Sequence, residues 1–128
     1  MASILRVNTL TDASSNNSVP MATVASGSLK TWANVKGTDT FTLRDSFNVS
    51  SATDTATGQP TITINSDMAN NDYSVSGTQG GTNGTDELRV PVNGGDFATG
   101  SYAYSTVNTG VALVDAPYSC TQVAGDLA

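Results

Sequence analysis

The side chains in this chain that are best suited to chemistry are aspartates in polar turns. Carboxylate oxygens there could bind a hard cation such as Ca²⁺, and two aspartates in a cleft could act on a glycosidic bond. No segment matches a calcium loop that ends in a bidentate glutamate, and a turn aspartate usually hydrogen-bonds the backbone. We therefore expect no catalytic residue and no cofactor, while a structural cation stays open. The aspartates that lie in such polar turns are Asp12, Asp54, Asp67, Asp72 and Asp96.

Other catalytic residue types are nearly missing. The chain has no histidine, which removes the commonest general base and any Ser-His-Asp triad. Zinc needs clustered Cys or His, and Cys120 is the only cysteine. We interpret Cys120 as a small core residue rather than a reactive thiol. An enzyme would depend on an Asp pair in a cleft, and we predict that the protein is not an enzyme.

The charge distribution excludes two classes of partner. The net charge is −6, and the few basic residues are scattered, so neither nucleic acid nor an acidic membrane surface is expected to bind. No apolar run approaches the ~20 residues that would span a bilayer. The opening sequence MASILRVNT lacks the features of a secretory signal. We expect a protein that stays in the cytoplasm where it is made until assembly or lysis.

The composition predicts one lean domain. Only 12% of the 128 residues are charged, against about 25% in typical proteins, and Ser, Thr, Asn and Gly replace them. Leu, Ile, Val and Phe make up roughly a fifth of the chain, close to the range of disordered proteins. Their strand-like spacing argues against disorder. Burial between subunits could stabilise such a core, which favours an oligomer.

We divide the chain into an N-terminal arm, 1–28, and a domain, 29–128. The arm combines a strand-like segment, 4–10, with a turn-rich segment, 11–20, and has too little apolar mass for its own core. It is either a frayed tail or an attachment or intersubunit segment, and its regularly placed apolar residues favour the second. Those residues are Ile4, Leu5, Val7 and Leu10.

The domain is predicted to be all-β, an antiparallel, jelly-roll-like β-sandwich with no helix longer than a turn. Strand patterns recur roughly every ten residues with turn signals between them. Pro91 places its strand at an edge or a bulge. The expected strands are 29–36, 40–49, 60–65, 73–77, 86–93, 101–107, 111–115 and 118–124.

Alternation along 40–49 predicts which side chains are buried, because a strand turns successive residues to opposite faces. Asp45 is the one polar residue on the apolar parity. The set predicted to be buried, in the subunit or at its interface, is Trp32, Phe41, Leu43, Phe47, Val49, Ile62, Ile64, Leu88 and Val90.

Two glycine-rich segments, 77–85 and 93–100, are interpreted as loops, because Asn-Gly is a strong turn signal. They lack the lysine of a phosphate-binding loop. With the tyrosines they could build a contact surface for a saccharide or a protein; alternatively, the tyrosines fill the domain or a subunit interface. The tyrosines are Tyr73, Tyr102, Tyr104 and Tyr118, and the candidate loop contacts are Thr78, Gln79, Asn83, Asn93, Asp96 and Phe97.

Several pieces of the chain resemble, in the same order, a small β domain of tailed-phage virion proteins. They are GSLKTWANVKGT (27–38), LRDSFNVSSATDTATG (43–58), TITI (61–64), Met68, DYSV (72–75), LRV (88–90) and VDAPYSCTQVAGD (114–126). The segment VNTLTDAS, 7–14, is similar to the opening of phage fibre subunits. The resemblance implies a homotrimeric β-rich surface component without catalytic residues. No repetitive shaft separates arm from domain, which favours a short knob, a fibre tip or a head decoration.

The sequence therefore predicts a virion structural protein. Its arm, through Ile4, Leu5, Val7 and Leu10, would attach to other virion proteins of the capsid or tail, and its trimeric domain could contact a host saccharide or protein. The alternative is a soluble carbohydrate-binding β module, which should be monomeric, with an exposed aromatic platform and a dispensable arm.

Overall fold

The computed structural model describes residues 3–81, 87–89 and 97–128. Strands dominate this part of the chain, and its one helix, α1, is short, which confirms the all-β prediction. The elements in chain order are β1 (Thr9–Thr11), β2 (Ser18–Pro20), α1 (Met21–Gly27), β3 (Leu29–Lys36), β4 (Thr42–Phe47), β5 (Val49–Ala56), β6 (Gln59–Ile64), β7 (Ser74–Gly80), β8 (Glu87–Arg89), β9 (Phe97–Ala98), β10 (Ser101–Ala103), β11 (Ser105–Val107) and β12 (Tyr118–Ala124).

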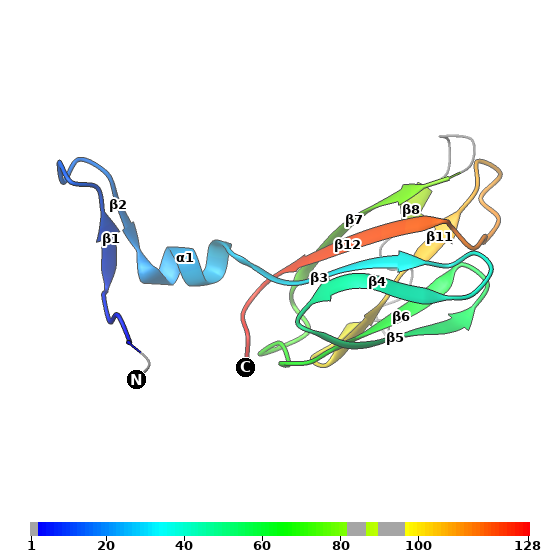
Figure 1. Cartoon of the computed structure of the whole chain (residues 1–128), viewed down its shortest axis with the longest axis horizontal. Helices are drawn as coiled ribbons and strands as arrows, with labels where there is room; N and C mark the ends of the chain where they lie inside the picture. Colours follow the sequence, from blue (N-terminus) through cyan, green and yellow to red (C-terminus); the bar gives the residue numbers. More distant parts are fainter. Residues whose placement is uncertain (1–2, 82–86, 90–96) are drawn as a thin grey trace.

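Two four-stranded sheets form the body of the protein. One has the order β4-β3-β12-β7 and the other the order β5-β6-β10-β9. The strand pairs are antiparallel, as predicted, including those of the two-stranded sheets β1-β2 and β11-β8. β1, β2 and α1 extend away from one end of this body (Figure 1).

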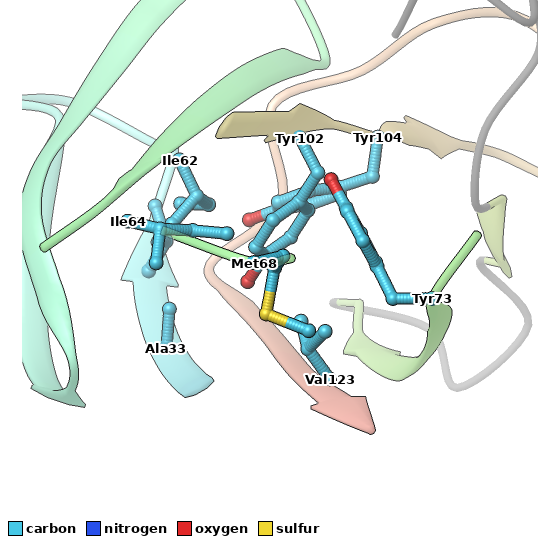
Figure 2. Close-up of a cluster of buried hydrophobic side chains, with 9 residues drawn as sticks. Ala33, Ile62, Ile64, Met68, Tyr73, Tyr102, Tyr104 and Val123 are labelled. Atoms are coloured by element: carbon cyan, nitrogen blue, oxygen red, sulfur yellow. The ribbon is translucent and has the colours of Figure 1, made fainter. Parts of the chain in front are cut away.

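Both four-stranded sheets contribute side chains to one core. Val35 on β3, Val123 on β12, and Ile62 on β6 are fully enclosed. Burial of Ile62 and Ile64 confirms their predicted place. Figure 2 shows the tyrosine rings gathered around Met68 between the strands. The cluster comprises Ala33, Val35, Ile62, Ile64, Met68, Tyr73, Tyr102, Tyr104 and Val123.

The hydroxyl groups of the buried tyrosines are hydrogen-bonded. Tyr102 lies 2.8 Å from the Thr121 hydroxyl, and Tyr104 lies 2.7 Å from the Ser119 hydroxyl. Tyr73 donates to backbone oxygens of Ala98 and Ser101, each at 2.9 Å. A buried hydroxyl without a partner would be costly, so these bonds explain why polar groups are tolerated in the core.

Gly58 holds the β5–β6 hairpin against the segment that precedes β12. Its φ is +65°, and an added Cβ would lie 2.7 Å from the oxygen of Thr106 and 2.8 Å from the backbone of Val114. Its amide donates to a carboxylate oxygen of Asp115 at 2.7 Å. Only glycine combines this backbone conformation with such a close approach.

The predicted strand 40–49 is wrong in its extent, because Asn48 divides it into β4 and β5. Asn48 has a φ of +56°, which asparagine tolerates better than most residues. Its amide donates to the oxygens of Lys30 and Ser66 and accepts from the amide of Ser66. Asn48 is therefore a corner at which the chain leaves one four-stranded sheet and enters the other.

Phe47 is not buried within the subunit, since 55% of its surface is exposed; its burial at a subunit interface stays a prediction. Asn34 pairs with Asp45 but Val35 pairs with Leu43, so Arg44 is an extra residue in β4. Such a bulge shifts the alternation by one residue. Leu43 therefore packs against the core, with Phe41 and Val49, while Phe47 faces outward beside Trp32, which is half-buried. The side chains of Leu88 and Val90 lie outside the described residues.

The remaining strand predictions differ in how well they match. β3 and β12 have the predicted bounds, and β6 and β7 differ from them by a few residues. The predicted strand 101–107 is split into β10 and β11, and 111–115 holds only an isolated bridge between Leu113 and Val107. Within 86–93 the structure describes β8 alone. α1 lies in the arm, for which no helix was predicted.

Candidate functional site

The arm carries the predicted attachment residues on an exposed surface. In the predicted strand 4–10 only the last two residues belong to β1, which pairs with β2 in a hairpin that was not predicted. Within 3–28, only Met21 is not exposed, and Ile4 and Leu5 expose 75% and 81% of their surfaces. Val7 and Leu10 are also exposed. All four apolar side chains are therefore open to contact with another molecule.

Asp12 closes the hairpin turn between β1 and β2. Its carboxylate accepts from the side-chain amide of Asn17 at 2.7 Å and from the backbone of Asn16 at 3.0 Å. The hydrogen bond from Asn17 is the main cause that lowers the pKa of Asp12. Asp12 was one of the candidate cation ligands, and in the structure its carboxylate has a structural role in the turn.

Lys30 joins the arm to the domain. It is buried, and its ammonium donates to the oxygen of Ala25 near the end of α1 and to the Ser28 hydroxyl, the latter at 2.7 Å. A cation near a helix C-terminus also interacts favourably with the helix dipole. Lys30 therefore fixes the direction in which the arm leaves β3, a role that sequence reasoning missed because it counted Lys30 only as a scattered charge.

A groove of about 510 Å³, here named the base groove, lies where the arm meets the domain. Its apolar members Leu29, Phe47 and Leu127 expose 45%, 55% and 43% of their surfaces. Asn48 and Ser66 line it beside them. The base groove places exposed apolar area next to the exposed arm.

The outward face of sheet β4-β3-β12-β7, here named the outer face, presents aromatic, amide and hydroxyl side chains in register. Trp32 lies opposite Phe47 on one side and Gln122 on the other, and Asn34 lies opposite Asp45 and Cys120. Between β3 and β7 the face holds a groove of about 480 Å³. Two neighbouring rows of this face, read across the four strands, are Phe47, Trp32, Gln122 and Ser76, and Asp45, Asn34, Cys120 and Thr78.

Cys120 lines this groove and is only half-buried, so its interpretation as a core residue is wrong. Alternation in β12 turns Ser119, Thr121 and Val123 inward and leaves Cys120 and Gln122 on the outer face. The alternation was visible in the sequence. Which of the two faces of β12 turns inward depends on the buried Tyr102 and Tyr104, whose hydroxyls hydrogen-bond to Thr121 and Ser119.

Tyr118 is the one tyrosine of the predicted contact set that is exposed. Tyr73, Tyr102 and Tyr104 are buried in the core. This matches the alternative prediction that the tyrosines fill the interior of the domain. Tyr118 exposes 52% of its surface, and the guanidinium of Arg44 lies 3.9 Å from its ring centroid. The Arg44 bulge thus places a cation on an aromatic ring at the edge of the outer face.

The three predicted loop contacts that the structure describes do not form one surface. Thr78 and Gln79 belong to β7 rather than to a loop; Thr78 is exposed, while the Gln79 amide donates to the oxygen of Val107 at 3.4 Å. Phe97 belongs to β9 and packs edge-to-face on Tyr73 at 4.9 Å. Asn83, Asn93 and Asp96 lie outside the described residues.

The described residues contain no group of three or more His, Cys, Asp or Glu side chains that could hold a metal ion. In the same part of the chain, no helix is long and apolar enough to cross a membrane. Comparison of the chain with protein-family models, curated proteins and solved structures found no match.

Proposed function

We propose that this chain is a structural protein of a tailed-phage virion, a short homotrimeric appendage such as a tail fibre tip, a knob or a head decoration. Residues 1–28 anchor it to capsid or tail proteins. Residues 29–128 form a jelly-roll-like β-sandwich that faces outward, where it can contact the host surface. The chain is made in the host cytoplasm and resides in the virion.

The exposure of the arm is the observation that carries this proposal. The arm has two strands and a helix, yet within 3–28 only Met21 is less than exposed, and α1 buries no residue. An isolated two-stranded hairpin and a seven-residue helix are both marginal in water. A partner surface that covers Ile4 and Leu5 would supply the missing burial, by packing or by adding β1 to a neighbouring sheet.

The base groove supports assembly into a trimer. Leu29, Phe47 and Leu127 are exposed apolar side chains beside the arm, so one contiguous contact could cover both. Association through this region would bury apolar area that the lean single-chain core leaves in water. The order of the segments that resemble the virion domain, from 27–38 to 114–126, adds to this support.

The alternative, a soluble carbohydrate-binding module, differs in two measurable ways. It is a monomer, and it does not need its arm. Light scattering of the purified chain separates the two functions, because the trimer has about three times the 13.1 kDa chain mass. A cooperatively folded monomer at micromolar concentration would favour the soluble module.

The anchoring role is tested by incorporation into particles. Leu5→Asp introduces a charge into the arm's most exposed apolar side chain, and Ser14→Asp introduces the same charge in the polar turn. We expect Leu5→Asp, like deletion of residues 1–28, to be lost from purified particles, and Ser14→Asp to be retained. Truncated protein at normal copy number on particles would refute the anchoring role. Loss of domain folding on truncation would instead place the arm in the trimer core.

A further inference from the structure

We infer that the groove of the outer face binds a neutral saccharide, with Trp32 as the stacking platform and Asn34 and Gln122 as hydrogen-bonding groups. This inference rests on the proposed function for its biological meaning. It adds to that function the kind of ligand that the outward-facing surface would bind. It shares Thr78 with the contact surface predicted from the sequence, which was otherwise built from the glycine-rich loops and the four tyrosines.

The shape and apolar part of the groove suit a sugar ring. Its volume of about 480 Å³ lies within the range of about 300–1,000 Å³ typical of small-molecule sites. Trp32 is half-buried, so its ring is held in place by neighbours while part of it faces solvent. Phe47 lies beside it across the β3–β4 pair. Aromatic side chains combine large apolar area with little conformational freedom, which favours stacking of a rigid ring.

The polar groups of the groove suit hydroxyls. Asn34 and Gln122 carry amides that can both donate and accept, and the hydroxyls of Ser76 and Thr78 lie in the same two rows. The side-chain oxygen of Asn34 is enclosed without a hydrogen-bond partner among the described residues. An unsatisfied buried acceptor is costly, so this amide has hydrogen-bonding capacity that the described residues do not use.

The charge on this face favours a neutral ligand. Asp45 lies next to Asn34 across the β3–β4 pair, and the chain carries a net charge of −6, so an acidic polysaccharide would be repelled. The described cations on this face are engaged elsewhere: Lys36 pairs with Asp39 at 3.1 Å, and Arg44 is stacked on Tyr118. A carboxylate accepts hydrogen bonds from neutral hydroxyls, so Asp45 can contribute to binding a neutral sugar.

A second copy of this chain fits this face less well than a sugar does. The lining of the groove includes amide and hydroxyl side chains such as Gln122 and Ser76. The centres of protein interfaces are enriched in aromatic residues and depleted in serine. The base groove, with its exposed Phe47 and Leu127, is the better candidate for contact between copies.

Ligand binding in the groove can be followed in the full-length protein with two intrinsic reporters. Trp32 and Cys120 both line the groove, and they are the only tryptophan and the only cysteine of the chain. The probes are maltohexaose, cellohexaose and chitohexaose, with alginate as the acidic comparison. We expect at least one neutral hexasaccharide to change Trp32 fluorescence saturably and to slow alkylation of Cys120, and alginate to do neither. Gln122→Ala should weaken binding about tenfold, as expected for one lost hydrogen bond, while Gln59→Ala on the other sheet should not.

The absence of a saturable signal with all three neutral probes would overturn the inference. A Trp32 signal that depends on protein concentration alone, together with a rising mass, would assign the outer face to contact between copies and overturn it as well. Neither result affects the anchoring role, because Gln122→Ala should still enter particles in the incorporation assay. A Leu5→Asp protein that is lost from particles but still binds the sugar would show that anchoring can fail while sugar binding is kept.

Discussion

The phenolic hydroxyl of Tyr102 on β10 lies 2.8 Å from the Thr121 hydroxyl on β12, so a hydrogen bond joins the two four-stranded sheets inside their shared core. Both residues are almost fully enclosed. This bond explains why a threonine occupies an inward position of β12 where an aliphatic residue would be expected.

Removal of both members of this pair should destabilise the fold by less than the two single removals added together. Tyr102→Phe or Thr121→Val alone leaves a buried hydroxyl without its partner, and we expect each to cost about 1–3 kcal/mol of unfolding free energy. The double variant should cost less than the sum of the single variants. Urea denaturation of the four proteins measures this coupling. Strict additivity would show that the two hydroxyls do not interact.

Alkaline pH should destabilise the domain through its buried tyrosines. Burial raises the pKa of Tyr102 to about 12 from 10, and raises that of Tyr104 as well. The folded state therefore holds these protons more tightly than the unfolded state does. Their stabilising contribution is complete below about pH 10 and is lost as pH rises toward 12.

For Tyr102 the loss in that window should approach about 1.4 kcal/mol per pH unit. Thermal unfolding between pH 8 and 12 should show the decline only above about pH 10. Tyr102→Phe should reduce its slope. Equal slopes in the two proteins would contradict the assignment of the decline to Tyr102.

Gly58→Ala should be strongly destabilising. The added Cβ would overlap the backbone of Thr106 and Val114, and the residue would keep a positive φ. We expect a loss of about 2 kcal/mol or more in unfolding free energy. Gly27→Ala is the matched control, because nothing lies within 4 Å of its Cβ position at the end of α1. A similar stability of both variants would contradict the close approach at Gly58.

Phe47 and Ile62 should respond differently to truncation. Ile62→Ala removes a fully buried side chain and should cost about 2–5 kcal/mol. Phe47→Ala removes an exposed ring, so the unfolding free energy of the dissociated chain should change by less than about 1 kcal/mol, while self-association weakens. Denaturation and sedimentation measure the two effects. A large folding loss for Phe47→Ala in the monomer would place its ring in the core.

Local patterns predicted much of the fold. β3 and β12 alternate clearly and are bounded by turn residues, and their predicted bounds are correct. β5 was missed because its residues are mostly polar and exposed, so no apolar alternation marks it. α1 was missed because small and β-branched residues are weak helix signals and the helix buries no face.

The errors at Phe47 and Cys120 come from information that is not local. The bulge at Arg44 depends on how β4 pairs with β3, and it reverses the face that follows. Which residues of β12 face inward depends on Tyr102 and Tyr104, whose buried hydroxyls need the hydroxyls of Thr121 and Ser119 as partners. The outer face could therefore be recognised only once the register of β4, β3, β12 and β7 was known.

The most direct test of the account is a micrograph of purified phage particles from cells that express this chain, labelled with an antibody against residues 29–128. If the chain is a virion component, label should appear at fixed positions on the head or tail of every particle and should be lost when residues 1–28 are deleted. Particles that carry no label, with all of the protein free in the lysate, would contradict the claim that this chain is a virion component.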